Sequence, residues 1–301
     1  MLNLLQKDIL DSIPTTSCCS NAFLSAVISL TKEEVCPSKI VLNCPKDIYN
    51  KVEACINNFY PQLNIKNGDK LVIAGDQIIE MLSELGLAEF DGSKLESTNS
   101  CNEDILFNEC CKITYIKAVF LCVGKMYYND DSLKKSSGYN LEFVFKNYQL
   151  ADDIFALTKY LHLNLKRIKR GNNIVLYSKD SQVLIKFLVM VGANSTAFEL
   201  QNNLVMREIR NDANRKGNCF DANLNKTINA SAEQVKAIDY IINNYGLDYL
   251  DASLQEVALL RLSNPESTLS ELQQLYSTPI TRAGLKYKLD RILEIYKKVK
   301  E

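Results

Sequence analysis

The amino-acid sequence predicts an α+β domain built from two related halves and followed by an all-α domain. Three observations support this prediction. An apolar helical segment that begins at Cys18-Cys19 returns 92 positions later, at Cys110-Cys111. The second copy of this segment opens a succession of elements in the order α-β-β-α-β-β-α. Beyond residue 230 the apolar residues recur at helical spacing only.

The composition indicates an ordered, cytoplasmic protein. The 301 residues are 47% apolar and 24% charged, with a net charge of −1. Such a chain can bury a large core and form two domains. Its near-neutral charge excludes a global attraction to nucleic acid, so any such binding depends on local basic patches. The N-terminus becomes polar too early for a signal peptide, and no apolar stretch is long enough to span a bilayer, so we expect no membrane partner.

The ten cysteines raise the question of disulfides or zinc. Adjacent residues such as Cys18 and Cys19 cannot easily bond to each other, and thiols stay reduced in the cytoplasm. No C-x-x-C pair occurs and His162 is the only histidine, so a structural zinc site would need four scattered thiolates. We therefore expect buried free thiols, no metal site and no cofactor.

The second half of the first domain has the clearer pattern. Tyr139, Leu141, Phe143 and Phe145 alternate with other residues, as in a strand with one buried face. A turn at 171–173 separates two later strands. The predicted helices are residues 110–125, 148–161 and a segment ending at Val191, and the predicted strands are 126–130, 139–146, 163–170 and 174–177.

The first half follows the same order more loosely. Its predicted helices are residues 18–30, 47–58 and 76–85, and its strands are 39–44, 62–66 and 70–74. We expect its first hairpin to be eroded, because Cys36-Pro37 and Cys44-Pro45 leave little room for it. The predicted domains are residues 1–194, with repeats at about 15–90 and 108–194, a linker at 195–230, and residues 231–301.

This duplicated architecture resembles the LAGLIDADG homing-endonuclease fold. The resemblance implies two central crossing helices and two sheets that form a saddle on duplex DNA. Small residues at helical spacing, namely Ala22, Ala26, Ala118 and Cys122, would permit the close crossing. The alternative is that these are ordinary amphipathic helices whose similarity is accidental.

In the nucleases of this fold, each motif helix ends in an acid that binds a divalent metal. The matching positions here are Thr31 and Val123, and neither can bind Mg²⁺ as a carboxylate. Glu33 and Glu34 are close, but a shift of two residues turns a helix by about 200°. Asp130 and Asp131 are too far along the chain. We therefore predict no catalytic residues and a saddle that only binds.

A basic strand supplies one candidate DNA contact. Residues 163–170 contain Lys166, Arg167, Lys169 and Arg170 and no acid. Strand alternation places Lys166 and Arg170 on one face and Arg167 and Lys169 on the other. These cations could contact phosphates. The alternative is a solvated hairpin tip.

The segment between the two domains supplies a second candidate. Residues 199–215 have a helical pattern, and residues 218–227 are rich in amide and hydroxyl side chains. This density predicts a non-regular segment that binds its own backbone or phosphates. The candidate residues are Asn223, Asn225, Lys226 and Thr227. The alternative is a capped loop that only connects the domains.

The C-terminal domain has the pattern of a helix-turn-helix module. Helices are predicted at residues 231–244, 253–262, 268–276 and 280–299, and Thr268 with Glu271 forms a capping-box motif. The last helix has one buried stripe, which contains Leu285, Leu289, Ile292, Leu293 and Tyr296.

The opposite face of that helix is the third and main candidate. Small residues near its N-terminus let the backbone approach base edges, while cations reach phosphates. The candidate residues are Thr281, Arg282, Ala283, Gly284, Lys286, Tyr287 and Lys288. Asp290 and Glu294 would repel DNA, so only the first two turns could enter a groove. The alternative is a three-helix module that binds a protein partner.

Together these features resemble the WhiA family. The most specific motif is the segment with Asn218-Cys219 and the run from Ala222 to Ala230, between the degenerate duplicated domain and the helix-turn-helix at about 268–298. The resemblance implies a non-catalytic DNA-binding protein linked to sporulation, or to cell division and chromosome segregation. The family usually has an Asn-His-Arg run where this chain has Lys286-Tyr287-Lys288. Charge is roughly kept, but a lysine is a point charge and not a planar fork, so the family's base preference does not carry over to this chain.

Three hypotheses follow. The favoured one is a nucleoid-associated regulator of transcription, division or segregation that binds double-stranded DNA and takes no small-molecule substrate. Proteins of the transcription or division machinery are a further class of expected partner. The second hypothesis is an active endonuclease, and the third is an interaction module whose saddle holds a protein.

Overall fold

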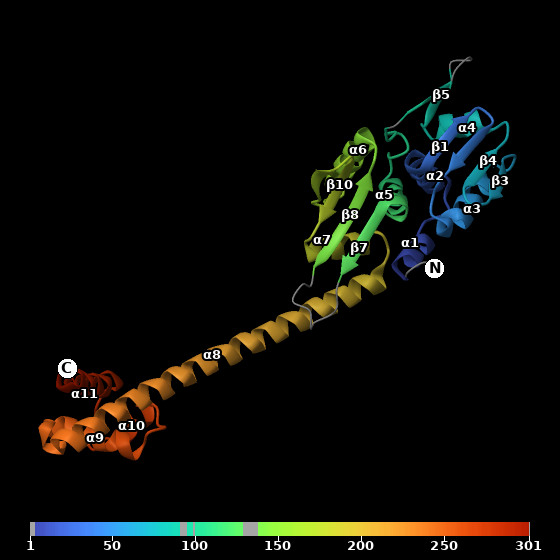
Figure 1. Cartoon of the computed structure of the whole chain (residues 1–301). Helices are drawn as coiled ribbons and strands as arrows, with labels where there is room; N and C mark the ends of the chain where they lie inside the picture. Colours follow the sequence, from blue (N-terminus) through green and yellow to red (C-terminus); the bar gives the residue numbers. More distant parts are fainter. Residues whose placement is uncertain (1–3, 91–94, 99, 129–137, 301) are drawn as a thin grey trace. The chain divides into compact units, whose positions relative to one another are not determined.

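The computed structural model describes residues 4–90, 95–98, 100–128 and 138–300. The chain divides into two compact units, Met1–Arg207 and Glu208–Glu301. The division falls within a 52-residue helix, α8 (Asn194–Tyr245), which also contains both predicted domain boundaries. Figure 1 shows the elements along the chain. None of the described helices combines the length and apolar character that crossing a bilayer requires.

The first half of unit 1 contains one four-stranded antiparallel sheet of order β1-β2-β4-β3. Its first helices are α1 (Leu4–Asp11) and α2 (Ser17–Thr31), and its strands are β1 (Lys32–Cys36), β2 (Lys39–Leu42), β3 (Asn64–Asn67) and β4 (Leu71–Ala74). A short 3-10 turn (Lys46–Ile48) leads into α3 (Tyr49–Phe59), and α4 (Ile78–Glu84) is followed by a hairpin of β5 (Ala88–Phe90) and β6 (Leu95–Ser97).

The second half repeats this plan, with a sheet of order β7-β8-β10-β9. Its elements are α5 (Glu109–Val123), β7 (Gly124–Tyr128), β8 (Tyr139–Phe145), α6 (Tyr148–Tyr160), β9 (Lys166–Arg170), β10 (Asn173–Ser178) and α7 (Ser181–Met190). Helices α2 and α5 each have 15 residues and begin 92 positions apart. The matching strand orders confirm the duplicated α+β fold. The end of the strand predicted at 126–130 lies outside the described residues, as do Asp130 and Asp131.

The first hairpin is not eroded, which corrects the expectation from the two prolines. Strands β1 and β2 pair antiparallel, with Cys36 opposite Lys39. Pro37 lies in the turn between them and Pro45 follows the second strand. Because neither proline occupies a ladder position, neither removes a hydrogen-bond donor from the sheet.

The core of unit 1 is centred on α2 and α5, which pack against each other. Ala22, Ala26 and Ala118 have no exposed surface, as the prediction of a close crossing requires, and Cys122 is half-buried. Beside them, the Phe120 and Phe187 rings lie 5.0 Å apart between centroids, under the second sheet. This aromatic packing holds one face of the second sheet against the helices.

Helix α8 corrects the prediction of a non-regular linker. Residues 218–227 are helical, and the Thr227 hydroxyl donates to the Asn223 carbonyl within the helix at 3.0 Å. The polar side chains of this segment are mostly exposed to solvent, so they do not have to compete with the backbone for hydrogen bonds. A high density of amide and hydroxyl side chains therefore does not exclude a helix when those side chains are exposed.

Unit 2 consists of the C-terminal part of α8, a 3-10 turn (Leu247–Tyr249) and three further helices. These are α9 (Ala252–Ser263), α10 (Leu269–Leu275) and α11 (Arg282–Lys300). The capping box at α10 is present, with the Thr268 amide donating to the Glu271 carboxylate at 2.6 Å. The apolar core of the unit is formed by Ile238, Ile241, Leu250, Leu254, Val257, Ala258, Leu272, Leu285, Leu289 and Ile292. The predicted stripe of the last helix is thus buried at its centre, while Leu293 and Tyr296 are half-buried.

Candidate nucleic-acid interface

The start of α11 is fixed by contacts with the turn that precedes it. The Gln273 side-chain amide in α10 donates to the Ile280 carbonyl at 2.8 Å. The Thr281 hydroxyl accepts from the Gly284 amide at 3.0 Å, which satisfies one free donor of the first helical turn. The Thr281 hydroxyl therefore caps the helix as an acceptor. The first turn is held firmly enough to present its side chains in one orientation.

The exposed side of these first turns carries the predicted cations. Arg282, Ala283, Lys286 and Tyr287 are exposed, and Tyr287 retains 70% of its surface. Positions four apart lie on the same side of a helix, so Arg282 and Lys286 form one basic edge. Asp290 is exposed one turn later on this side, at the place where the sequence analysis expected an acid to repel DNA.

Gly284 has a structural role at the start of α11. A Cβ atom at this position would lie 3.1 Å from Ile280 Cγ1 and 3.3 Å from the Thr281 hydroxyl oxygen. The missing side chain lets the turn pack closely against the helix. The glycine therefore helps to set the angle between the turn and α11.

Lys288 does not belong to the exposed basic edge. Its ammonium donates to the Tyr276 hydroxyl at 2.6 Å and to the Ser253 carbonyl at 3.3 Å. In the same network, a hydrogen bond from Ser277 lowers the pKa of the Glu256 carboxyl, with a smaller contribution from Lys288. Lys288 thus joins α9, the turn and α11, and its contact with phosphate stays a prediction.

The basic strand β9 lies at the edge of the second sheet, and all five of its residues are exposed. Arg167 and Lys169 pair with the buried Leu176 and Ile174, so they lie on the face covered by helices. There Arg167 forms an ion pair with Asp152 of α6, and the Lys169 ammonium lies 5.6 Å from the centre of the Tyr148 ring.

Lys166 and Arg170 lie on the opposite face of this sheet, which is turned away from the helices. Arg170 lies 3.6 Å from the Glu142 carboxylate, so its charge is partly balanced. The predicted alternation is therefore confirmed. It leaves two of the four cations on the face that could meet DNA.

The candidates on α8 are not gathered into a site. Asn223, Lys226 and Thr227 share one side of the helix, whereas Asn225 is turned about 200° from Asn223. The Thr227 hydroxyl is already used in its backbone hydrogen bond. A regular helix thus separates residues that a folded loop would have brought together.

The ends of α2 and α5 lack the acids of the nuclease motif. Thr31 and Val123 are the last residues of the two helices, and the Thr31 hydroxyl donates to the Val27 carbonyl at 2.7 Å. Glu33 forms an ion pair with Lys70, which lowers its pKa, and it also accepts from Asn43 at 2.8 Å. Glu34 pairs with Lys39 at 2.9 Å. Both acids of β1 are therefore engaged with residues in the adjoining strand β2 or directly beside β2 and β4.

Comparison with known proteins gives the family of the two domains. The sequence model described as the WhiA C-terminal HTH domain matches residues 213–296, and that of the WhiA LAGLIDADG-like domain matches residues 112–210. The "Probable cell division protein WhiA" of Thermoanaerobacter sp. (strain X514) is 32% identical over 283 residues, covering 91% of this chain and 85% of the relative. The protein belongs to the WhiA family.

Other members of the WhiA family match over almost the full length. The "Probable cell division protein WhiA" of Carboxydothermus hydrogenoformans is 28% identical over 308 residues, covering 98% of this chain and 96% of the relative. The crystal structure of full-length DUF199/WhiA from Thermatoga maritima has a TM-score of 0.53 at 20% identity, covering 98% of this chain and 96% of that one. This structural likeness supports the fold.

Sequence reasoning missed a cluster of thiols in this WhiA family member. Cys18 and Cys19 near the start of α2 lie beside Cys110 and Cys111 near the start of α5, so these four thiols are not scattered. The expectation of buried thiols is also incomplete, since Cys18, Cys110 and Cys219 are exposed. The equal offset of 92 positions in both pairs was the signal that could have revealed the cluster.

Proposed function

We propose that this protein is a non-catalytic, DNA-binding regulator of cell division that reads its site with the first two turns of α11. The observation that carries the proposal is the exposed basic edge of Arg282 and Lys286 on a helix whose start is fixed by the preceding turn. The WhiA helix-turn-helix match and the names of the curated relatives support it.

The chemistry of this edge suits a duplex. Arginine and lysine at the helix start can bind phosphates on either side of a groove, while Ala283 leaves space for base edges. The positive end of the helix dipole adds to the attraction for phosphate. We infer that the protein acts at the nucleoid in the cytoplasm, on transcription or chromosome segregation.

A genome-wide binding map of the tagged chain, combined with a salt series on the recovered sites, tests this proposal. We expect discrete sites and an affinity that falls as salt rises, because phosphate binding releases counterions. Binding that shows no site preference and no dependence on salt would contradict DNA recognition by α11.

Strand scission is not expected. Purified protein incubated with supercoiled plasmid and Mg²⁺ should leave the plasmid intact, because Thr31 and Val123 stand where a metal-binding acid is needed. A restriction enzyme in the same buffer provides the positive control. The endonuclease hypothesis would be supported instead by magnesium-dependent nicking that co-purifies with the protein. Substitutions in α2 and α5 should then abolish that nicking.

We also infer that the second sheet assists binding through Lys166 and Arg170. Replacing both with alanine should lower the affinity for a specific site about fivefold and reduce the salt dependence by about one to two ions. The matched control replaces Arg167 and Lys169, which contact α6 on the other face, and should leave affinity unchanged. Equal losses from both double variants would mean that this strand acts only through general charge. If neither double variant loses affinity, DNA contact is restricted to surfaces other than β9.

A further inference from the structure

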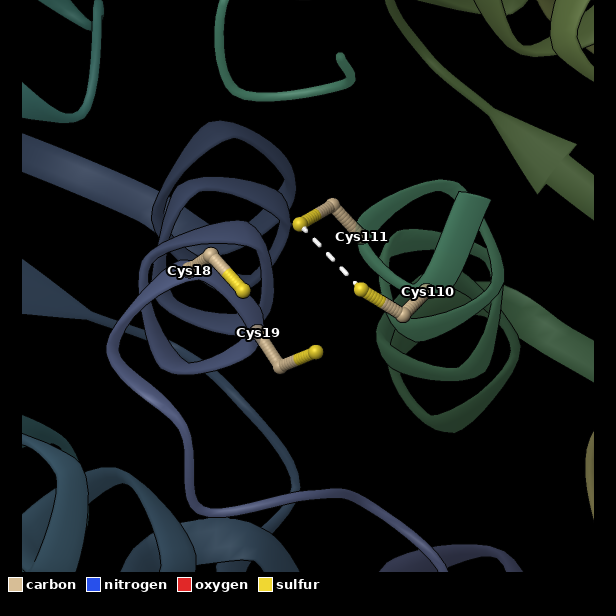
Figure 2. A group of neighbouring side chains, drawn as sticks. All are labelled: Cys18, Cys19, Cys110 and Cys111. Carbon is tan, nitrogen blue, oxygen red and sulfur yellow. Dashed lines mark hydrogen bonds between the residues drawn. The ribbon is translucent and has the colours of Figure 1, made fainter. Parts of the chain in front are cut away.

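The four clustered thiols come from equivalent positions in the two repeats. Cys18 and Cys110 are the second residues of α2 and α5, and Cys19 and Cys111 are the third. All four sulfur atoms lie within 4.8 Å of one another, and the Cys110 and Cys111 sulfurs are 3.9 Å apart (Figure 2). Each helix thus contributes a pair of thiols toward one shared point.

These spacings fit a single tetrahedral ion. With zinc–sulfur bonds of about 2.3 Å, the sulfurs of a tetrahedron are about 3.8 Å apart, so only a small closing movement is needed. Iron–sulfur clusters distribute their thiolates over several metal atoms and need a wider frame. Because the four groups are all sulfur donors, the site favours a soft or borderline ion over magnesium or calcium.

The surroundings also suit thiolate ligands. The positive dipole ends of α2 and α5 lie at the cluster and favour thiolates, whereas burial and the neighbouring thiols raise the pKa of Cys111. Lys117 of α5 is buried, which lowers its pKa, and its ammonium donates to the Ser12 carbonyl at 2.9 Å. Cys18 and Cys110 are exposed while Cys19 and Cys111 are buried, so an ion can enter from one side only.

We propose that Cys18, Cys19, Cys110 and Cys111 form a structural Zn²⁺ site that joins the N-terminal ends of the two central helices. Binding releases the thiol protons to solvent and connects two halves whose ligands are 92 residues apart in the chain. The site lies at the helix ends opposite Thr31 and Val123, so it would serve the packing of the two repeats and not strand scission.

The test begins with the full chain purified with its thiols reduced. Metal analysis should find about one zinc ion per chain, and replacement by Co²⁺ should give the intense visible bands and sulfur-to-metal charge transfer of a tetrahedral thiolate site. Removing the metal with a chelator should lower the melting temperature of the protein. A reduced wild-type chain that binds neither ion, or a cobalt spectrum without thiolate bands, would overturn the proposal.

Variants then assign the site to these residues. Replacing the exposed Cys18 and Cys110 with serine should weaken Co²⁺ binding at least about hundredfold and abolish the effect of the chelator on melting. The matched control, Cys36→Ser with Cys219→Ser, removes two thiols outside the cluster and should bind one ion as before. Circular dichroism establishes that each variant is folded. The cobalt spectrum of the wild-type chain tests the proposal even if one of the variants does not fold.

Two results would replace the proposal with another account. Unchanged metal binding in the Cys18→Ser, Cys110→Ser variant would place the ion elsewhere. A disulfide between α2 and α5 that survives reduction and excludes the ion, detected by mass spectrometry of the digested protein, would make the cluster a covalent link. The proposed recognition of DNA by α11 does not depend on this outcome, since that surface is part of the other unit.

Discussion

Replacing both Arg282 and Lys286 with alanine should weaken binding to a specific DNA site at least about tenfold, measured by fluorescence anisotropy near physiological salt. These side chains form the exposed basic edge at the start of α11. Each removed phosphate contact should also lower the slope of log affinity against log salt by about one, so the double variant should lose about two.

A matched control uses the other end of the same helix. Lys297 and Lys298 are also exposed, and their replacement with alanine removes the same charge four turns away. This control should retain its affinity within about twofold, because charges beyond about 10 Å are largely screened at this salt. Comparable loss in both double variants would mean that the helix attracts DNA only through its total charge. That result would contradict recognition by the first two turns.

The fold was predictable where a pattern repeats over many residues. The strand alternation in β8, with Leu141 and Phe143 buried, and the stripe of Leu285 and Leu289 on α11 depend only on local periodicity and on which face is covered. The capping box at Thr268 is likewise local, because its two hydrogen bonds join residues three apart.

Features that depend on tertiary contacts were not predictable from the sequence. The sequence does not distinguish Lys288 from Lys286, but the Lys288 ammonium reaches Tyr276 across the turn. Pro37 was expected to disrupt a hairpin, and it occupies the turn instead. The cluster that includes Cys18 and Cys110 requires two helices from different repeats to begin at the same point, and only the equal offset between the repeats, not the spacing within either segment, points to it.

The candidate site, too, was predictable from local periodicity and not from tertiary contacts. Sequence located the basic edge of α11 and the alternation of β9, because exposed cations follow from periodicity. It could not separate cations with partners, such as Arg167 beside Asp152, from those left for a ligand. That separation depends on side-chain neighbours from other elements.

Arg261 offers the other large expected effect, on stability rather than on contact with DNA. Its side chain is 2% exposed, and burial lowers the pKa of its guanidinium. The guanidinium donates to the Ser267 carbonyl at 2.7 Å, the Ser231 hydroxyl at 3.3 Å and the Asn264 carbonyl at 3.4 Å. Arg261 thereby ties the end of α9 and the loop before α10 to α8.

Replacing Arg261 with alanine should destabilise unit 2 by about 3 kcal/mol, because buried acceptors lose their donor and a cavity remains. For a unit of this size the melting temperature should fall by about 12 to 24 °C, which calorimetry of the full chain can measure. The control, Arg291→Ala, removes an exposed arginine that pairs with Glu294 at 2.9 Å, and should change stability by less than about 0.5 kcal/mol.

The substitutions at Arg282 with Lys286 and at Arg261 distinguish residues that contact DNA from a residue that stabilises the fold of unit 2. The Arg282 and Lys286 variant should melt like the wild type while binding poorly. The Arg261 variant should bind well at low temperature and lose affinity as unit 2 unfolds, because its effect on DNA passes through the packing of α8, α9 and the turn. If the Arg261 variant keeps the wild-type melting temperature, the buried guanidinium contributes little. The loop at 264–267 must then be held by other contacts.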